Sequence, residues 1–177
     1  MHLKNDAKHF GLLAIVLHWF MAVLIIGLLG VGLYMVDLPI SAEKLKLYGQ
    51  HKEFGLLVLA LVILRLFWRF INTTPQLNIP LWEAIAARAA HWALYIFMFA
   101  MPITGWLQTS AAGLPPSFFG LFTLPSLVAP NEDLRSLFAT IHEWLAYGLI
   151  ATICLHTAAA LKHHFIDKDD ILKRMIS

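Results

Sequence analysis

The segment HEWLAYGLIATICLHTAAALKHH, residues 142–164, decides the fold class. It is apolar over most of its length, yet it carries histidine at positions 142 and 156 and ends in the polar sequence Lys162-His163-His164. In an α-helix, the step of 14 residues from His142 to His156 corresponds to about 21 Å of rise and about 3.9 turns. We therefore expect both imidazoles on one face of a membrane-spanning helix, one near each membrane surface.

The rest of the chain has the same membrane-like composition. Of its 177 residues, 59% are hydrophobic and only 14% are charged, compared with about 25% in soluble domains. A span needs about 20 apolar residues, so four spans and their connections fill one domain over residues 1–177. The sequence thus predicts an all-α integral membrane protein, an up-and-down four-helix bundle. Its predicted spans are 10–36, 51–71, 89–112 and 142–162.

Charge and cysteine content exclude other classes. The net charge of +2 is too small and too scattered to indicate a nucleic-acid partner. The single cysteine, Cys154, rules out an intrachain disulfide and is interpreted as a packing residue in an apolar run.

Lysine and arginine residues predict the orientation, because cytoplasmic loops carry the excess of these residues. One side of the predicted bundle has Lys4, Lys8, Arg65, Arg69, Arg88, Lys162, Lys168, Lys173 and Arg174. The other side has Lys44, Lys46, Lys52 and Arg135. We therefore expect both termini in the cytoplasm. Arg65 and Arg69, one turn apart, are expected to reach the cytoplasmic interface together.

Five histidines fall in or beside the spans, where ionisable side chains are costly and usually mark function. His18 lies about 12 Å into the first span and His156 about 9 Å before the end of the fourth, so both belong to the cytoplasmic half. His51 and His142 each stand at the outer start of an inward-running span. The five therefore contain two depth-matched pairs, and His91 is left without a partner.

The residues one turn away from these histidines support the same pairs. A haem between two helices needs an imidazole from each helix and a shallow surface beside the ring, and residues at i and i+4 share a face. The small neighbours of the four paired histidines are Ala14, Gly55, Ala146 and Ala160. His91 has the bulky Tyr95 at this distance, so it is left out of the ligand set.

The histidines could also form interhelical hydrogen bonds or bind a bare metal ion. A lone membrane histidine most often forms an interhelical hydrogen bond, but depth-matched pairs favour ligation. A bare zinc or copper site usually includes carboxylates or thiolates, and the only acids at the spans are Glu53 and Glu143, both beside the outer pair. Iron with two imidazole ligands has no open position, so such haems are expected to carry electrons rather than bind oxygen.

Several motifs resemble the bacterial dihaem cytochrome b561 family. They are Leu17-His18-Trp19, the His51 helix, His142-Glu143 followed by Trp144, LHTAAALKHH at 155–164, Lys168-Asp169 and LKRM at 172–175. The likeness covers essentially the whole chain. It implies two haem b in the bacterial inner membrane, with ligand pairs that fall on His18 with His156 and on His51 with His142. It also implies a superoxide:ubiquinone oxidoreductase that takes electrons from periplasmic superoxide.

The residues suggest where these substrates could bind. Superoxide is an anion, and the outer side carries Lys44, Lys46, Lys52 and Arg135, which could equally be ordinary loop charges or partners of haem propionates. For ubiquinone, we single out cytoplasmic residues of which an imidazole could deliver a proton. These are His91, Arg88, His163 and His164, and interfacial anchoring is their alternative role.

Two other functions remain open at this point. The chain could be a cytochrome b relay subunit that passes electrons between quinone and a dehydrogenase or periplasmic partner, with the outer connection 113–143 as its docking surface. It could also be a non-redox membrane protein with structural histidines. No particular protein partner is indicated by the sequence.

Overall fold

The computed structural model describes residues 3–6, 9–75 and 79–176, so Lys8 lies outside the described residues. Its four long helices are α1 (Leu12–Val36), α2 (Ala42–Ile71), α3 (Leu81–Ala111) and α4 (Glu132–Lys162). A short hairpin, β1 (Ser117–Phe118) and β2 (Phe122–Thr123), precedes α4, and a π-helical turn, η1 (His163–Asp167), and a 3-10 turn, η2 (Lys173–Met175), follow it. All four long helices are long and apolar enough to cross a membrane. The predicted all-α fold is confirmed.

Three of the helices begin earlier than the predicted spans. The Ser41 hydroxyl accepts a hydrogen bond from the Lys44 backbone N–H at 3.2 Å, and the Asn131 side chain accepts one from Leu134 N–H at 2.9 Å, so each caps a helix start. Pro80, which suits a helix start, precedes α3. The predicted spans followed the apolar runs, so they missed the polar first turns of α2 and α4 and the start of α3 after Pro80.

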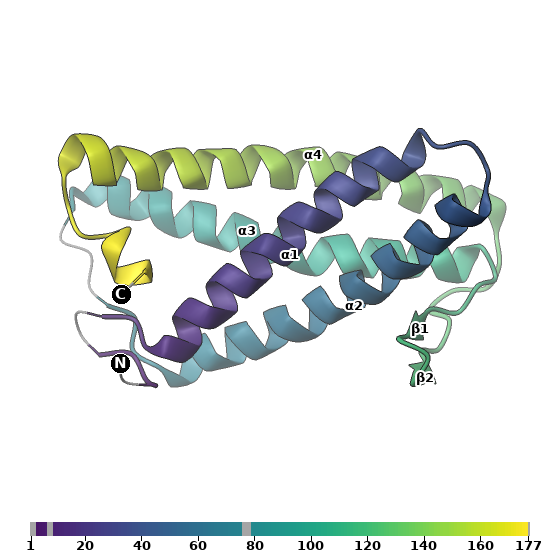
Figure 1. Cartoon of the computed structure of the whole chain (residues 1–177), viewed down its shortest axis with the longest axis horizontal. Coiled ribbons are helices and arrows are strands. Elements are labelled where there is room, and N and C mark those ends of the chain that lie inside the picture. Colours follow the sequence, from purple (N-terminus) through teal and green to yellow (C-terminus); the bar gives the residue numbers. More distant parts are fainter. Residues whose placement is uncertain (1–2, 7–8, 76–78, 177) are drawn as a thin grey trace.

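The four helices run up and down, so both termini lie at one end of the bundle and the β-hairpin at the other (Figure 1). We call these the terminal end and the hairpin end. α3 packs along α4, α1 against α2, and α2 against α3. The connection expected over 113–143 is shorter than that, because its second half forms the first turns of α4.

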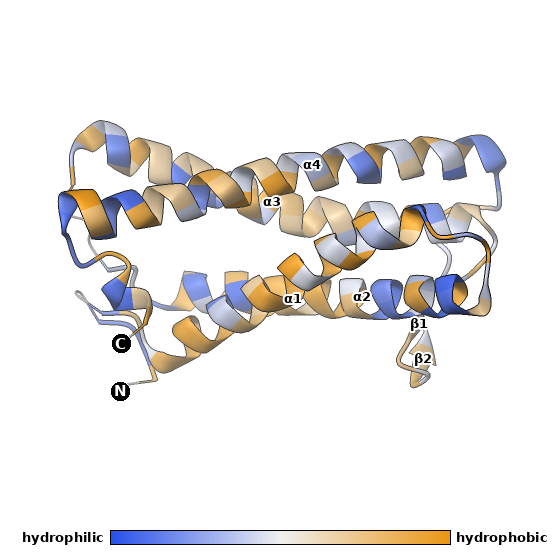
Figure 2. Ribbon diagram, turned by 45° about the horizontal axis from the view of Figure 1, so that its top comes forward, coloured by the Kyte–Doolittle hydropathy of each residue, from blue (hydrophilic) through white to orange (hydrophobic). Residues whose placement is uncertain are grey.

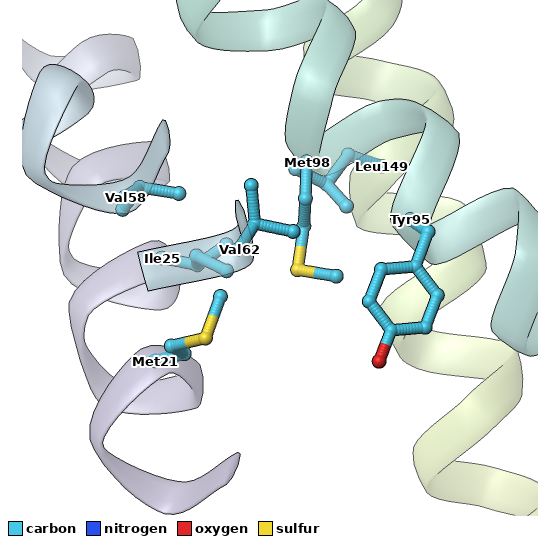
Figure 3. Packing of buried hydrophobic residues seen from close by; sticks show 7 residues of the cluster. All are labelled: Met21, Ile25, Val58, Val62, Tyr95, Met98 and Leu149. Carbon is cyan, nitrogen blue, oxygen red and sulfur yellow. The ribbon is translucent and has the colours of Figure 1, made fainter. Parts of the chain in front are cut away.

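A cluster of buried apolar side chains from all four helices lies between the two ends (Figure 3). It comprises Met21, Ile25, Val58, Val62, Tyr95, Met98 and Leu149. Leu149 stands midway along α4 between His142 and His156, so the cluster separates the levels of these two histidines.

The middle parts of the helices consist mostly of hydrophobic residues (Figure 2), and many of these side chains face outward. Val23 and Ile26 of α1, for example, are 71% and 57% exposed. Apolar residues on all sides of a helix are typical of a membrane span. The composition of this surface thus fits lipid rather than water.

Candidate functional site

Two pairs of histidines face one another across the bundle. His18 of α1 lies opposite His156 of α4, with ring centroids 6.3 Å apart and an interplanar angle of 65°. His51 of α2 lies opposite His142 of α4, also at 6.3 Å, with an angle of 72°. We call these the terminal pair and the hairpin pair, after the ends of the bundle at which they lie. They are the pairs expected from depth.

The separation of 6.3 Å is the one that a metal ion between two imidazoles requires. An imidazole nitrogen lies roughly 1.1 Å from its ring centre and a metal–imidazole bond is about 2.0–2.1 Å, so two opposed ligands have ring centres about 6.3 Å apart. The ring of His91 is only 5.5 Å from that of His156. His91 therefore packs against the terminal pair without matching this spacing.

His51 and His142 lie deeper within their helices than the sequence predicted. His51 lies nine residues after the start of α2, and His142 lies ten residues after the start of α4, so neither stands at a helix start. They still match in depth, because both helices begin earlier by similar lengths. A similar shift puts His91 ten residues into α3.

Two glycines make room for the hairpin pair. A Cβ atom on Gly32 of α1 would lie 3.2 Å from Cε1 of His51, and one on Gly105 of α3 would lie 3.4 Å from Cε1 of His142. The sequence did not predict the role of these two glycines, because a search one turn from each histidine finds small neighbours only on the histidine's own helix. A Cβ on Gly55, which that rule did select, would meet nothing within 4 Å.

A threonine orients the imidazole of His142. The Thr104 hydroxyl lies 2.8 Å from the Ala100 carbonyl, 2.9 Å from the Met101 carbonyl and 3.0 Å from Nδ1 of His142. We assign its single proton to one of the two carbonyls, the usual bond of a threonine hydroxyl within a helix. Toward His142 the hydroxyl oxygen therefore accepts, so Nδ1 carries the proton and Nε2 keeps its lone pair for a metal.

The terminal pair has different neighbours. Nη2 of Arg65 lies 2.9 Å from Nδ1 of His18. Arg69, one turn along α2, lies over the Tyr95 ring, with 5.7 Å from Cζ to the ring centroid. Arg65 is only partly exposed, so it does not simply extend to the interface as expected.

Comparison with known proteins identifies the family. The family model for prokaryotic cytochrome b561 matches residues 9–177. The chain belongs to the prokaryotic cytochrome b561 family. Cytochrome b561 homolog 2 of Escherichia coli K12 is 36% identical over 99% of this chain and 95% of its own length. Cytochrome b561 homolog 1 of the same strain is 35% identical over 77% of this chain and 78% of its own length. A probable superoxide oxidase CybB of Yersinia pestis is 28% identical over 96% of each chain.

Membership of the cytochrome b561 family makes this chain a haem-binding membrane protein of electron transport. The residues present fit that cofactor. In the described part of the chain, Nδ1 of His51 is buried without a hydrogen-bond partner, and His156 forms no hydrogen bond through its side chain. These imidazoles are therefore free of structural hydrogen bonds that would compete with a metal.

The four cations singled out at the hairpin end divide into two groups. Nζ of Lys44 donates to the Val36 carbonyl at 3.0 Å and to the Leu38 carbonyl at 2.6 Å, so it closes the end of α1. Arg135 forms an ion pair with Glu132. Lys46 and Lys52 make no hydrogen bond or ion pair with other described residues.

Lys52 also lines a pocket of about 250 Å³ at the hairpin end. The pocket lies between α2 and the segment leading into β1, and its lining residues are Gly49, Lys52, Glu53, Leu114, Pro115 and Ser117. Lys52 directly follows His51 in α2, and the pocket holds one cation, Lys52, and one carboxylate, Glu53.

The four residues considered for quinone have separate environments. Nε of Arg88 donates to the Ala84 carbonyl of its own helix at 3.3 Å, and His91 packs on His156. Nδ1 of His163 lies 2.7 Å from Asp169. Nδ1 of His164 is buried without a hydrogen-bond partner among the described residues.

An ionic cluster joins α3 to the end of α4 at the terminal end. Nζ of Lys162 lies 2.9 Å from Glu83 and 2.7 Å from Asp167. Ligand atoms of Glu83, His163 and Asp167 are close enough to hold a metal ion. The ammonium group of Lys162 already supplies a positive charge to both carboxylates, so we interpret the cluster as a structural tie.

Proposed function

We propose that the protein binds two haem b, one held by His51 and His142 and one by His18 and His156, and that electrons pass between them across the membrane. The observation that carries this proposal is the common ring separation of 6.3 Å in both pairs. Ligation by two imidazoles leaves a haem iron free to change oxidation state without binding a further ligand. The pairs lie on either side of the apolar cluster, so electron transfer would link the two membrane surfaces.

The terminal end faces the cytoplasm in this proposal, and the membrane is the bacterial inner membrane. The distribution of lysine and arginine supports this orientation, since the terminal end carries most of them. The hairpin end then faces the periplasm.

The electron donor that we propose is superoxide, which reacts at the hairpin end. Two superoxide anions each lose one electron and leave as O2, and ubiquinone takes up the two electrons and two protons to become ubiquinol. Lys52, which follows His51 and makes no ion pair with other described residues, supports this choice, because a lysine at this end would attract an anion. The relative from Yersinia pestis named as a probable superoxide oxidase points the same way. Of the four predicted cations, Lys52 is the best placed for this role.

Ubiquinone would be reduced at the terminal end, where protons come from the cytoplasm. Arg88, His91, His163 and His164 remain the candidates for its site. The unpartnered Nδ1 of His164 supports a role in proton delivery, since it is free to bond a quinone oxygen. His163 is held by Asp169 and is better suited to positioning.

The test mixes purified protein with superoxide in a stopped-flow instrument, with and without ubiquinone, after a pyridine haemochrome assay has counted the haems. We expect two haems per chain, rapid reduction by superoxide, and one ubiquinol formed for every two superoxide anions consumed. Two haems without reduction by superoxide would favour the relay subunit, whose electrons come from a partner protein. A chain without haem would contradict both functions.

A further inference from the structure

The contact between Arg65 and His18 fixes the position of one proton. A guanidinium group has only donors, so at 2.9 Å from Nη2 of Arg65 the Nδ1 atom of His18 must accept. In a neutral imidazole the proton then resides on Nε2. This is the opposite arrangement to that of His142, whose Nδ1 donates to Thr104.

That tautomer is incompatible with ligation of iron through Nε2. A neutral ligating imidazole keeps its proton on the nitrogen that does not bind the metal, and this nitrogen donates to a second group. Arg65 cannot accept such a bond. If His18 binds haem iron, as proposed above, Arg65 must leave Nδ1 when the haem enters.

The displaced guanidinium needs an anion. Charged groups at membrane depth are costly unless they are paired. Within the described residues, no carboxylate lies within ion-pair distance of Arg65 or Arg69: Arg65 contacts the neutral imidazole of His18, and Arg69 lies over the Tyr95 ring. This part of the bundle therefore has an excess of positive charge, and a haem b carries two propionates.

We propose that Arg65 and Arg69 form a carboxylate-binding site for a propionate of the haem at the terminal pair, with Arg69 packed over the Tyr95 ring. The two arginines share one face of α2, because residues at i and i+4 are neighbours on a helix. The planar fork of Arg65 suits bidentate binding of a carboxylate. This proposal rests on ligation by His18 and His156, and it adds the group that fixes how the haem is turned between them.

The experiment compares Arg65→Gln, Arg65→Lys and Arg69→Gln with the wild type, and uses the exposed Lys4→Gln as the matched loss of one charge at the same end. Two quantities are measured, the midpoint potential of each haem and the resonance Raman bending band of the haem propionates. We expect Arg65→Gln to shift the reduction equilibrium of the terminal haem toward the ferric form by at least tenfold, about 59 mV for one electron. Its propionate band should move, while Lys4→Gln leaves both quantities unchanged.

The two arginine controls separate binding from a simple electric field. Arg65→Lys keeps the charge, so a field effect would be fully restored, whereas bidentate binding would be restored only in part and the propionate band would still differ. Arg69→Gln should shift the same haem in the same direction, and it tests the site even if Arg65→Gln fails to retain haem. A propionate band unchanged in all three variants would overturn the proposal.

The result can also be told apart from a failure of the proposed haem sites. A His18→Ala variant that keeps both haems would contradict ligation by His18 itself. A His18→Ala variant that loses one haem, together with arginine variants of unchanged potential, would leave the haem sites standing and reject only the propionate site. A rise in the potential of the terminal haem in Arg65→Gln would mean that Arg65 stays bonded to His18 in the wild type. That result would also reject the propionate site.

Discussion

The hairpin pair and the terminal pair have the same ring separation but different surroundings. At the hairpin pair, Thr104 accepts a hydrogen bond from His142, and Gly32 and Gly105 leave room for the imidazoles where a Cβ atom would contact them. At the terminal pair, Arg65 donates to His18, and the ring of His91 packs against His156. No glycine of the described residues approaches the imidazoles of the terminal pair in this way.

This difference shows that spacing alone does not prepare an imidazole for iron. On the proposed ligation, His142 already holds its proton on the nitrogen away from the metal, so its imidazole is preorganised. His18 holds its proton on the other nitrogen and must exchange it before ligation. We therefore expect the hairpin pair to bind haem without rearrangement, and the terminal pair to bind it together with a movement of Arg65.

Loss of a ligand gives the largest expected effect. His51→Ala and His142→Ala should each remove the same spectral component, and His18→Ala and His156→Ala the other, because a haem bound by one imidazole loses half of its protein ligands. Haem content, measured by the pyridine haemochrome assay, should fall from two per chain to one. Redox-resolved spectra identify which component is lost.

His91→Ala is the control for this series, because its ring lies in the same layer but at 5.5 Å from His156. It should keep both haems. If His91→Ala removed a haem and His18→Ala did not, the ligand assignment at the terminal end would be wrong.

Thr104→Val should give the next largest effect, confined to the hairpin pair. Valine has nearly the shape of threonine but cannot accept the proton of His142 Nδ1, so the imidazole becomes a weaker donor to iron. The reduction equilibrium of this haem should shift toward the ferrous form by about tenfold, or about 59 mV. Redox titration of the hairpin haem measures this shift. Thr104→Ser, which keeps the hydroxyl, is the control. Equal shifts in both haems would argue against a local hydrogen bond.

The sequence was sufficient for the fold and for which histidines lie opposite one another, while ligation of haem by them stays a prediction. Apolar length gave the four helices, and the 14-residue step in α4 gave two histidines on one face. The starts of the helices were harder to predict, because capping by Ser41 and Asn131 extends α2 and α4 beyond their apolar parts.

Individual side-chain contacts between helices could not be predicted from the sequence. Gly32 faces His51 from α1, and Thr104 faces His142 from α3, and nothing in the local pattern of either residue predicts the approach. Arg65 was interpreted as an interfacial residue from its place one turn before Arg69, and its contact with His18, 47 positions away, could not be predicted from that local pattern. Such partners depend on the packing of helices, which periodicity does not specify.

A smaller effect is expected from Lys52→Gln, which alters the hairpin end without touching an imidazole. The positive charge of Lys52 should attract superoxide, so its loss should lower the bimolecular rate of haem reduction by a few-fold. This is less than the tenfold or more that a whole charged surface contributes. The salt dependence of the rate should weaken as well, because ions screen this attraction over about 8 Å at physiological strength. Stopped-flow measurements over a range of salt concentrations test both effects.

Arg135→Gln makes the same change in net charge away from the pocket, where Arg135 is paired with Glu132. Its effect on the rate should be weaker than that of Lys52→Gln. A rate indifferent to salt and to both substitutions would count against superoxide as the donor, and would favour the relay subunit.

The smallest effect is expected from adding one methyl group beside the hairpin pair. In Gly32→Ala, the new Cβ would lie 3.2 Å from Cε1 of His51, closer than ordinary contact, so the imidazole must shift by a few tenths of an ångström. The potential of the hairpin haem should then change by less than the tenfold expected for Thr104→Val, since the ligand and its hydrogen bonds remain. Gly30→Ala, on the same helix with nothing within 4 Å of its Cβ, adds the same methyl group without this contact and should leave both haems unchanged. If the terminal haem responded to Gly32→Ala as strongly as the hairpin haem, the two pairs would be mechanically coupled through α1, and the independence of the two ends would have to be given up.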